Sequence, residues 1–235
     1  MHEVLQKFFS PHAFRVALPD VWSGFQLNLK MMVVAEILVL ILALGIAVVR
    51  GLPGRGAGPF RALAIVYTDV FRGTPLILVA FLVGFGLPGL NMRVISTQSN
   101  FVYGVTALTL VYTAYVTEVY RAGIESVHPS QRMAARSLGL SYFQAMRYVV
   151  VPQAVRRVIP PLLNDFVGLQ KDTALVTVIG VAEATQQAQQ FSQNNYNFTS
   201  YVVAAVFFIL LTIPLARFTD HLISVRERRE RAQMT

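Results

Sequence analysis

The stretch MMVVAEILVLILALGIAVV, residues 31–49, decides the fold of this 235-residue chain. Only Glu36 interrupts its apolar character. A helix rises about 1.5 Å per residue, so about 20 apolar residues cross the roughly 30 Å of hydrocarbon in a bilayer. The stretch therefore predicts a membrane-spanning helix, with lipid as the main solvent of the chain.

The composition of the whole chain agrees with a membrane protein. Hydrophobic residues make up 54% and charged residues 14%, whereas soluble domains average about 25% charged residues. Disordered chains are poor in apolar residues, so disorder is excluded. The absence of cysteine excludes disulfides and thiolate chemistry. The four histidines are scattered without the spacing of metal ligands, so no metal site is expected.

Four further apolar runs complete the predicted membrane domain. The run at 64–87 reaches spanning length only if it begins near Ala64, because 76–87 alone is too short. The run at 159–182 is less pure and carries Asp165, Lys171 and Asp172. The other two are 101–120 and 201–215, the last extending to about residue 218. We therefore expect an all-α membrane protein with five transmembrane helices.

Basic residues are distributed unevenly between the two sides of these spans. Fourteen of the Lys and Arg residues fall on one side and three on the other, and positive charge collects on the cytoplasmic side of membrane proteins. We expect the C-terminus to be cytoplasmic and the N-terminus to be outside. The fourteen are Arg50, Arg55, Arg61, Arg121, Arg132, Arg136, Arg147, Arg156, Arg157, Arg217, Arg226, Arg228, Arg229 and Arg231, and the three are Lys7, Arg15 and Arg93.

The segments outside the spans have distinct characters. Residues 1–23 form an external N-terminal segment in which 3–9 predict a short amphipathic helix before Pro11. Residues 221–235 form a basic cytoplasmic tail, expected at anionic lipid headgroups. The loop at 183–200 is rich in Gln and Asn. It fits either an external surface for a partner or a solvated connector.

The longest cytoplasmic loop, 121–157, predicts a helical hairpin. Ser130 is expected to cap its first helix, and Gly139 suits a left-handed residue at the helix end. Ala134, Ala135 and Leu138 are spaced to share one face of that helix. This face fits either a groove on another protein or the protein's own bundle.

The second helix of the hairpin is expected at 142–151. Ser141 can cap its start, and Pro152 is expected to break it because proline lacks the amide hydrogen that continues a helix.

The order and spacing of several motifs resemble a known family. Met133-Ala134-Ala135, Gly139 and the later VVVP at 149–152 are spaced like the EAA loop of ABC importer permeases. The rest of the chain, over about 24–220, is similar to the polar amino-acid subfamily. Met133 stands where that family has a glutamate that supports contact with the ATPase. The flanking motifs are FRGTPL at 71–76, LGLS at 138–141, VPQA at 151–154 and KDTAL at 171–175.

The resemblance implies a permease subunit with the type I importer fold in a bacterial inner membrane, with 24–220 as the permease domain and 128–152 as the coupling loop. It implies a second permease subunit, like or unlike this one. Two ATPase subunits would bind ATP and Mg, and an extracytoplasmic protein would deliver an amino acid. The chain has no Gly-x-x-x-x-Gly-Lys-Ser/Thr phosphate loop of its own. The implied coupling residues are Met133, Ala134, Ala135, Arg136, Leu138, Gly139 and Ser141.

Ionisable residues at membrane depth are costly and are candidates for function. At about 1.5 Å per residue, Lys171 and Asp172 lie roughly 18–20 Å into the fourth span. They offer both charge signs to a zwitterion, or they belong to a structural ion pair. Arg72 and Glu118 can pair as part of a gate or anchor helix ends. The candidates for the path or gate are Glu36, Arg72, Thr74, Glu118, Lys171, Asp172 and Thr173.

Rival functions are also compatible with these residues. One is an importer permease for another small solute, such as methionine or an opine. Others are a membrane enzyme and a secondary transporter that uses Glu36 and Asp172 as proton relays. A proton-driven carrier would work without a nucleotide-binding partner, so co-purification with an ATPase separates the classes.

Overall fold

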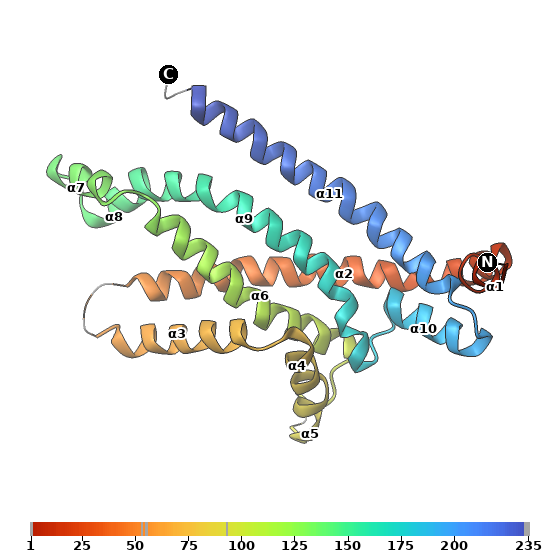
Figure 1. Cartoon of the computed structure of the whole chain (residues 1–235). Coiled ribbons are helices and arrows are strands. Elements are labelled where there is room, and N and C mark those ends of the chain that lie inside the picture. The colour runs from red at the N-terminus through yellow and green to blue at the C-terminus, as the bar shows by residue number, and fades with distance from the viewer. Residues whose placement is uncertain (1, 53, 55, 93, 233–235) are drawn as a thin grey trace.

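The computed structural model describes residues 2–52, 54, 56–92 and 94–232, and every element in these ranges is helical (Figure 1). Arg55, Arg93 and 233–235 lie outside the described residues, as do the side chains of the tail arginines from Arg226 onward. The elements are α1 (His2–Phe8), α2 (Pro11–Gly51), α3 (Gly58–Gly73), α4 (Leu76–Phe81), the π-helix η1 (Leu82–Gly86), α5 (Leu87–Gly89), α6 (Asn100–Glu125), α7 (Pro129–Ser137), α8 (Tyr142–Ala145), the π-helix η2 (Met146–Val150), α9 (Val151–Asp172), the 3-10 helix η3 (Thr173–Ile179), α10 (Ala184–Asn195) and α11 (Thr199–Ala232).

Helices α2 and α6 pack together at the centre of the bundle. Ser10 caps α2 by accepting a hydrogen bond from the Ala13 amide at 3.3 Å. Ala35 and Ala43 of α2 and Ala107 of α6 are fully buried in the main apolar cluster. These small side chains let helix backbones approach closely, as is typical of helix packing in membranes.

The second predicted span is sharply bent. Helices α3 and α4–α5 meet at 106° at Thr74 and Pro75. A residue before proline avoids the helical region, and Thr74 is accordingly extended at ψ 127°. The apolar run at 64–87 is therefore divided between two helices, which pass as one membrane-spanning unit only when the bent pair is taken together.

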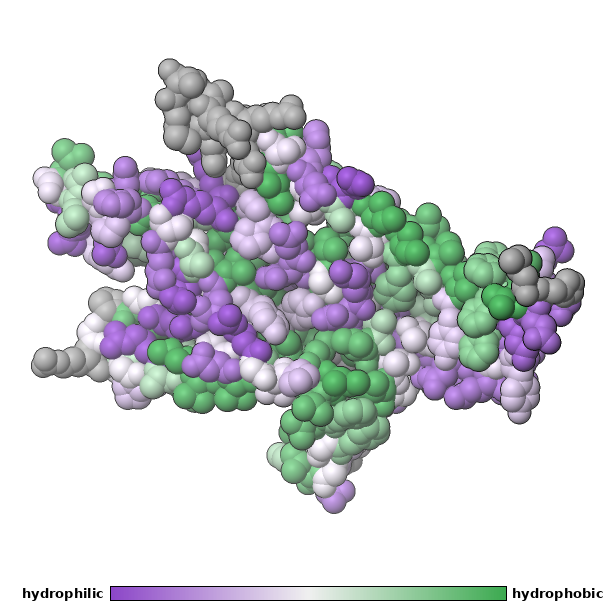
Figure 2. All heavy atoms as spheres, viewed as in Figure 1, coloured by the Kyte–Doolittle hydropathy of each residue, from purple (hydrophilic) through white to green (hydrophobic). Residues whose placement is uncertain are grey.

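By length and composition, three helical stretches among the described residues can cross a membrane. They are Glu3–Gly51, Asn100–Glu125 and Thr199–Val225, and the bent pair of Gly58–Gly73 and Leu76–Gly89 is the fourth candidate. Helix α9, the expected fourth span, is not among them and contains Asp165, Lys171 and Asp172. Figure 2 shows hydrophobic side chains over α4 and α5 and hydrophilic ones between α3 and α9.

The predicted hairpin forms at one end of the bundle (Figure 1). It differs from the prediction at the cap of its first helix and at Pro152. His128, and not Ser130, caps α7: its Nδ1 accepts from the Ser130 amide at 3.2 Å. Pro129 then takes the first helical position, where proline costs no hydrogen bond. Gly139 has φ +85°, the left-handed conformation expected at the helix end.

Pro152 does not break the second helix. Ser141 and Gln144 form a capping box at α8, and the chain then passes through the π-helix η2 directly into α9. Pro152 lies in the first turn of α9, where the wider π turn that precedes it accommodates its missing amide hydrogen.

Helix α9 tightens into η3 and ends at Gly180, which has φ +74°. Helices α1 and α10 lie at the opposite end of the bundle from α7 and α8 (Figure 1). A second apolar cluster holds this end together and includes Val21 and Phe25 of α2, Ala184 and Ala188 of α10, and Val203 of α11.

Candidate functional site

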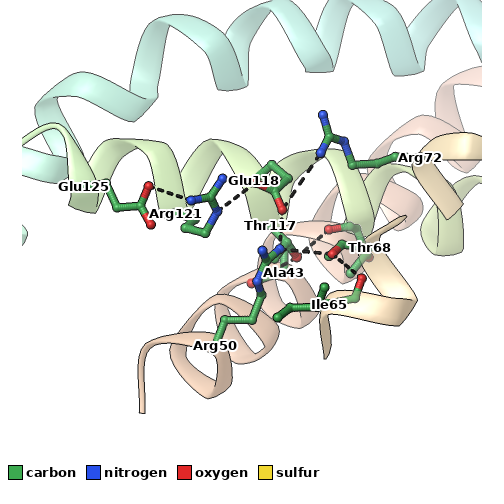
Figure 3. A network of polar contacts seen from close by, with 10 residues as sticks. Ala43, Arg50, Ile65, Thr68, Arg72, Thr117, Glu118, Arg121 and Glu125 are labelled. Carbon is green, nitrogen blue, oxygen red and sulfur yellow. Dashed lines mark hydrogen bonds and ion pairs between the residues drawn. The ribbon is translucent and has the colours of Figure 1, made fainter. Parts of the chain in front are cut away.

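A charged junction centred on Glu118 joins α2, α3 and α6 (Figure 3). Arg50 of α2 bonds directly to Glu118 and also donates to Thr68 Oγ1 at 3.0 Å. Arg121 approaches Glu118 Oε2 to 2.7 Å, and Arg72 of α3 lies 3.9 Å from Oε1. The Glu118 carboxylate thus forms ion pairs with three guanidinium groups from three helices.

The ion pairs that Glu118 forms with Arg50 and with Arg72 differ in strength. Arg50 and Glu118 are 13% and 15% exposed, so their attraction is poorly screened. Arg72 is 44% exposed and is the most distant of the three cations. The Arg72–Glu118 pair foreseen from the sequence is present, but Arg50 carries the stronger contact. Arg50 was missed because its position after the first span identified it only as a topology-setting charge.

A cleft of about 380 Å³ lies beside the junction. Arg72 and Arg157 place cations on its wall, and Asp165 of α9 places a carboxylate there. The Oδ2 atom of Asp165 is buried and has no hydrogen-bond partner among the described residues. The cleft therefore carries both charge signs, which is the chemistry that a zwitterionic solute requires. Its lining residues are Arg72, Tyr115, Glu118, Val119, Ala122, Gly123, Ser126, Arg157, Pro161 and Asp165.

Asp165 is a site residue that sequence reasoning did not select. It lies seven positions before Asp172, so both carboxylates lie on one face of α9, two turns apart. Both act electrostatically on Tyr112 of α6. That spacing was the signal that could have found Asp165.

Asp172 and Lys171 lie in different surroundings. Asp172 accepts a hydrogen bond from Tyr112 Oη at 2.8 Å. Lys171 is exposed and lines a separate apolar groove of about 430 Å³ with residues of α10 and α11. The two side chains form no ion pair with each other, as expected for adjacent helical positions about 100° apart.

The remaining candidates occupy three places. Thr74 donates to the Val70 carbonyl at 2.8 Å at the bend of the second span. Thr173 is buried and accepts from Asn28 Nδ2 at 3.1 Å. Glu36 is half-buried, and the charged group that acts on it is Asp165. Among the described residues no ion pair joins Glu36 to a cation.

A buried polar contact between Asn28 and Glu183 was also missed. Glu183 is fully buried and caps α10 by accepting from the amides of Thr185 and Gln186, at 2.8 and 2.9 Å. Asn28 Nδ2 adds a third bond at 3.1 Å. Glu183 was expected to begin an exposed loop, and the structure corrects this. Burial raises the pKa of Glu183, and the amides at the helix start, which carry partial positive charge, oppose this rise.

The hairpin presents apolar side chains at the tip of the bundle. Met133 and Leu138 are 60% and 84% exposed, whereas Ala135 is buried against the chain itself. Ala134 and Arg136 are exposed, and Ser141 forms the cap of α8. The three residues Ala134, Ala135 and Leu138 therefore do not all face outward. Large exposed apolar patches are typical of interaction surfaces.

The chain belongs to the family of binding-protein-dependent transport system inner membrane components, whose profile matches residues 54–225. The described fold is thus that of a membrane component of a transport system.

Three relatives illustrate the similarity. The chain is 36% identical over 198 residues to the arginine transport system permease protein ArtQ of Bacillus subtilis, covering 83% of this chain and 88% of ArtQ. It is 36% identical over 201 residues to the probable glutamine ABC transporter permease protein GlnM of Bacillus subtilis, covering 85% and 90%. A crystal structure of an amino acid ABC transporter with histidines contains a chain that is 35% identical, with a TM-score of 0.79 and coverage of 90% and 94%.

Proposed function

We propose that the chain is the membrane-spanning subunit of an ATP-driven importer for a polar amino acid. The observation that carries this proposal is similarity over most of the chain to permeases named for arginine and glutamine. The cleft of Arg72, Arg157 and Asp165 supports it, because an amino acid has a carboxylate and an ammonium group that need opposite partners.

In the proposed topology the chain crosses a bacterial inner membrane five times, with the N-terminus outside and the C-terminus in the cytoplasm. Helix α9 supplies the fourth crossing, with its charged residues turned toward the bundle or the path, where such residues are tolerated. Residues 1–23 lie outside, 24–220 form the permease domain, and 221–235 form the cytoplasmic tail. The α7–α8 hairpin then faces the cytoplasm and α10 faces outward.

The proposed partners are two ATPase subunits, a second permease subunit and an external binding protein. ATP and Mg are bound by the ATPase subunits. The α7–α8 hairpin receives their movement through exposed Leu138 and Met133, with Gly139 setting the turn. Met133 is apolar and flexible, so it can fill a groove on the ATPase although the family motif has glutamate there. The remaining coupling residues are Ala134, Ala135, Arg136 and Ser141.

The proposed path runs along the cleft beside the Glu118 junction. Arg72 forms the weakest ion pair of the junction, so the carboxylate of a passing solute can displace it from Glu118. Asp165 and Asp172 lie deeper along the same face of α9. Thr74 lies at the bend between α3 and α4. The other residues proposed for the path or gate are Glu36, Lys171 and Thr173.

Uptake by proteoliposomes tests the proposal. The purified assembly is reconstituted with the binding protein outside and ATP inside, and labelled arginine, glutamine and glutamate are supplied. We expect uptake that needs ATP and the binding protein and is unaffected by a proton gradient. Uptake driven by a proton gradient without ATP would instead show a secondary transporter. Transport of methionine or an opine, with none of the three amino acids, would show a different solute.

A further inference from the structure

Helix α1 lies across the end of the bundle and is fixed there. In Figure 1 it is seen nearly along its axis, whereas α2 and α11 run across the view. The Phe198 amide donates to the Lys7 carbonyl at 2.7 Å, and Asn197 Nδ2 donates to the Gln6 carbonyl at 2.9 Å. A seven-residue helix is not stable in isolation, so these bonds to the α10–α11 turn hold α1 in place.

Helix α1 carries exposed apolar side chains on one side, and its polar residues Glu3, Gln6 and Lys7 are exposed as well. Val4, Leu5 and Phe9 are 56%, 54% and 58% exposed, and Phe8 is 41% exposed. Phe9 directly follows α1, and its amide donates to the Leu5 carbonyl at 2.9 Å as in a helix. The four positions therefore have the helical spacing i, i+1, i+4 and i+5 and form one stripe. Glu3 lies outside this stripe, as do Gln6 and Lys7, whose carbonyls accept the bonds from the turn.

The stripe continues into the exposed surface of α11. Phe8 stacks on Phe198 with ring centroids 5.2 Å apart and an interplanar angle of 18°. Phe198 in turn stacks on Tyr201 at 6.4 Å and 22°. Tyr201 opens the apolar run of α11, a helix long and apolar enough to cross a membrane. Beyond it, Ile209 and Leu210 are 51% and 64% exposed.

We propose that α1 is an interfacial helix whose Val4, Leu5 and Phe9 insert into the lipid bilayer at the end of the bundle where α10 lies. Aromatic residues concentrate at membrane interfaces, and the Phe8–Phe198–Tyr201 stack stands where α11 begins its apolar run. A helix lying flat with its apolar face in the headgroup boundary is a known mode of membrane attachment. Under the topology proposed above, the leaflet is the external one.

The cysteine-free sequence makes the test direct. Single substitutions Leu5→Cys and Phe9→Cys on the stripe, and Glu3→Cys and Gln6→Cys off it, carry a nitroxide label. The purified assembly is placed in nanodiscs of phosphatidylethanolamine and phosphatidylglycerol. Collisions of each label with oxygen, which enters lipid, and with a water-soluble nickel chelate are compared. Phe8 is left intact, so the stack that fixes α1 is preserved.

We expect the labels at positions 5 and 9 to collide more with oxygen, and those at positions 3 and 6 more with the nickel chelate. Equal access of the chelate to all four positions would overturn the proposal. Chelate access at positions 5 and 9 that is lost only when the binding protein is added would also overturn it, and would identify a protein-docking surface. A label at Leu210→Cys is the control: its exposure to the chelate would show instead that α11 is not in lipid.

Discussion

Tyr112 donates its phenolic hydroxyl to Asp172 at 2.8 Å and so joins the middle of α6 to the last turn of α9. The approach depends on Gly168, one turn earlier on α9, where a Cβ atom would stand 3.1 Å from the same hydroxyl oxygen. Asp172 therefore has a fixed neighbour inside the bundle, whereas Lys171 beside it faces a different groove. Lys171 and Asp172 form no ion pair with each other, so a solute would contact them separately.

Replacing Tyr112 with Phe is expected to destabilise the bundle by about 1–3 kcal/mol, because Asp172 loses a buried hydrogen-bond donor. Tyr115→Phe is the matched control, since Tyr115 Oη makes only a 3.5 Å contact with the Arg72 carbonyl. Thermal unfolding of the detergent-solubilised assembly measures both. Equal melting temperatures for the two variants would show that the Tyr112–Asp172 bond contributes nothing to stability.

Glu118→Gln is expected to cost about 3 kcal/mol, because Arg50 is left nearly buried without a counter-charge. Arg72→Gln is expected to cost less than about 1 kcal/mol, as is usual for an exposed pair, while it alters the solute concentration that gives half-maximal uptake. Unfolding and uptake are measured on both variants. The account of the junction is contradicted if Arg72→Gln proves the more destabilising change.

Gly24→Ala is expected to destabilise the protein by about 1–3 kcal/mol through overpacking. The added Cβ would lie 2.6 Å from the Ala184 nitrogen and the Glu183 carbonyl carbon, which are backbone atoms that cannot move aside. Gly45→Ala on the same helix is the control, because nothing lies within 4 Å of the added atom. That change is expected to be neutral or stabilising by up to about 1 kcal/mol. Melting temperatures that fall equally would refute the close contact of α2 with the start of α10.

Leu138→Asp is expected to leave stability within about 0.5 kcal/mol, because the side chain is 84% exposed. It is expected to lower the yield of co-purified ATPase and to abolish ATP-dependent uptake, since a charge replaces the apolar contact. Ser137→Asp adds the same charge one residue away and is expected to retain the ATPase. A Leu138→Asp assembly that transports normally would remove this side chain from the docking surface.

Local signals in the sequence predicted the parts of the fold that depend on neighbouring residues. The apolar stretch at 31–49 lies within the long helix α2, Gly139 adopts the left-handed conformation, and Ser141 caps its helix. The cap on α7 was misplaced because Pro129 takes the first helical position, which moves the cap back to His128. The 106° bend at Thr74 and Pro75 was not predicted, because its angle depends on how α4 packs.

Contacts between distant residues could not be read from the sequence. Arg50 and Glu118 are 68 positions apart, and Asn28 and Glu183 are 155 apart. Each of these four residues has an ordinary local role, as a flanking charge, a polar helix residue or the start of a loop. Only the packing of α2 against α6 and α10 brings them together. Of the pairings in the candidate site, the sequence predicted Arg72 with Glu118 but not the closer contact of Glu118 with Arg50.

The most direct measurement uses a single cysteine at position 138 in the otherwise cysteine-free chain, in membranes that contain the whole assembly. A short bifunctional reagent then tests which protein lies against the α7–α8 hairpin. The account predicts a crosslink to the ATPase subunit whose yield changes when ATP is bound. Modification of position 138 by a membrane-impermeant thiol reagent added outside intact cells, with no such crosslink, would contradict it.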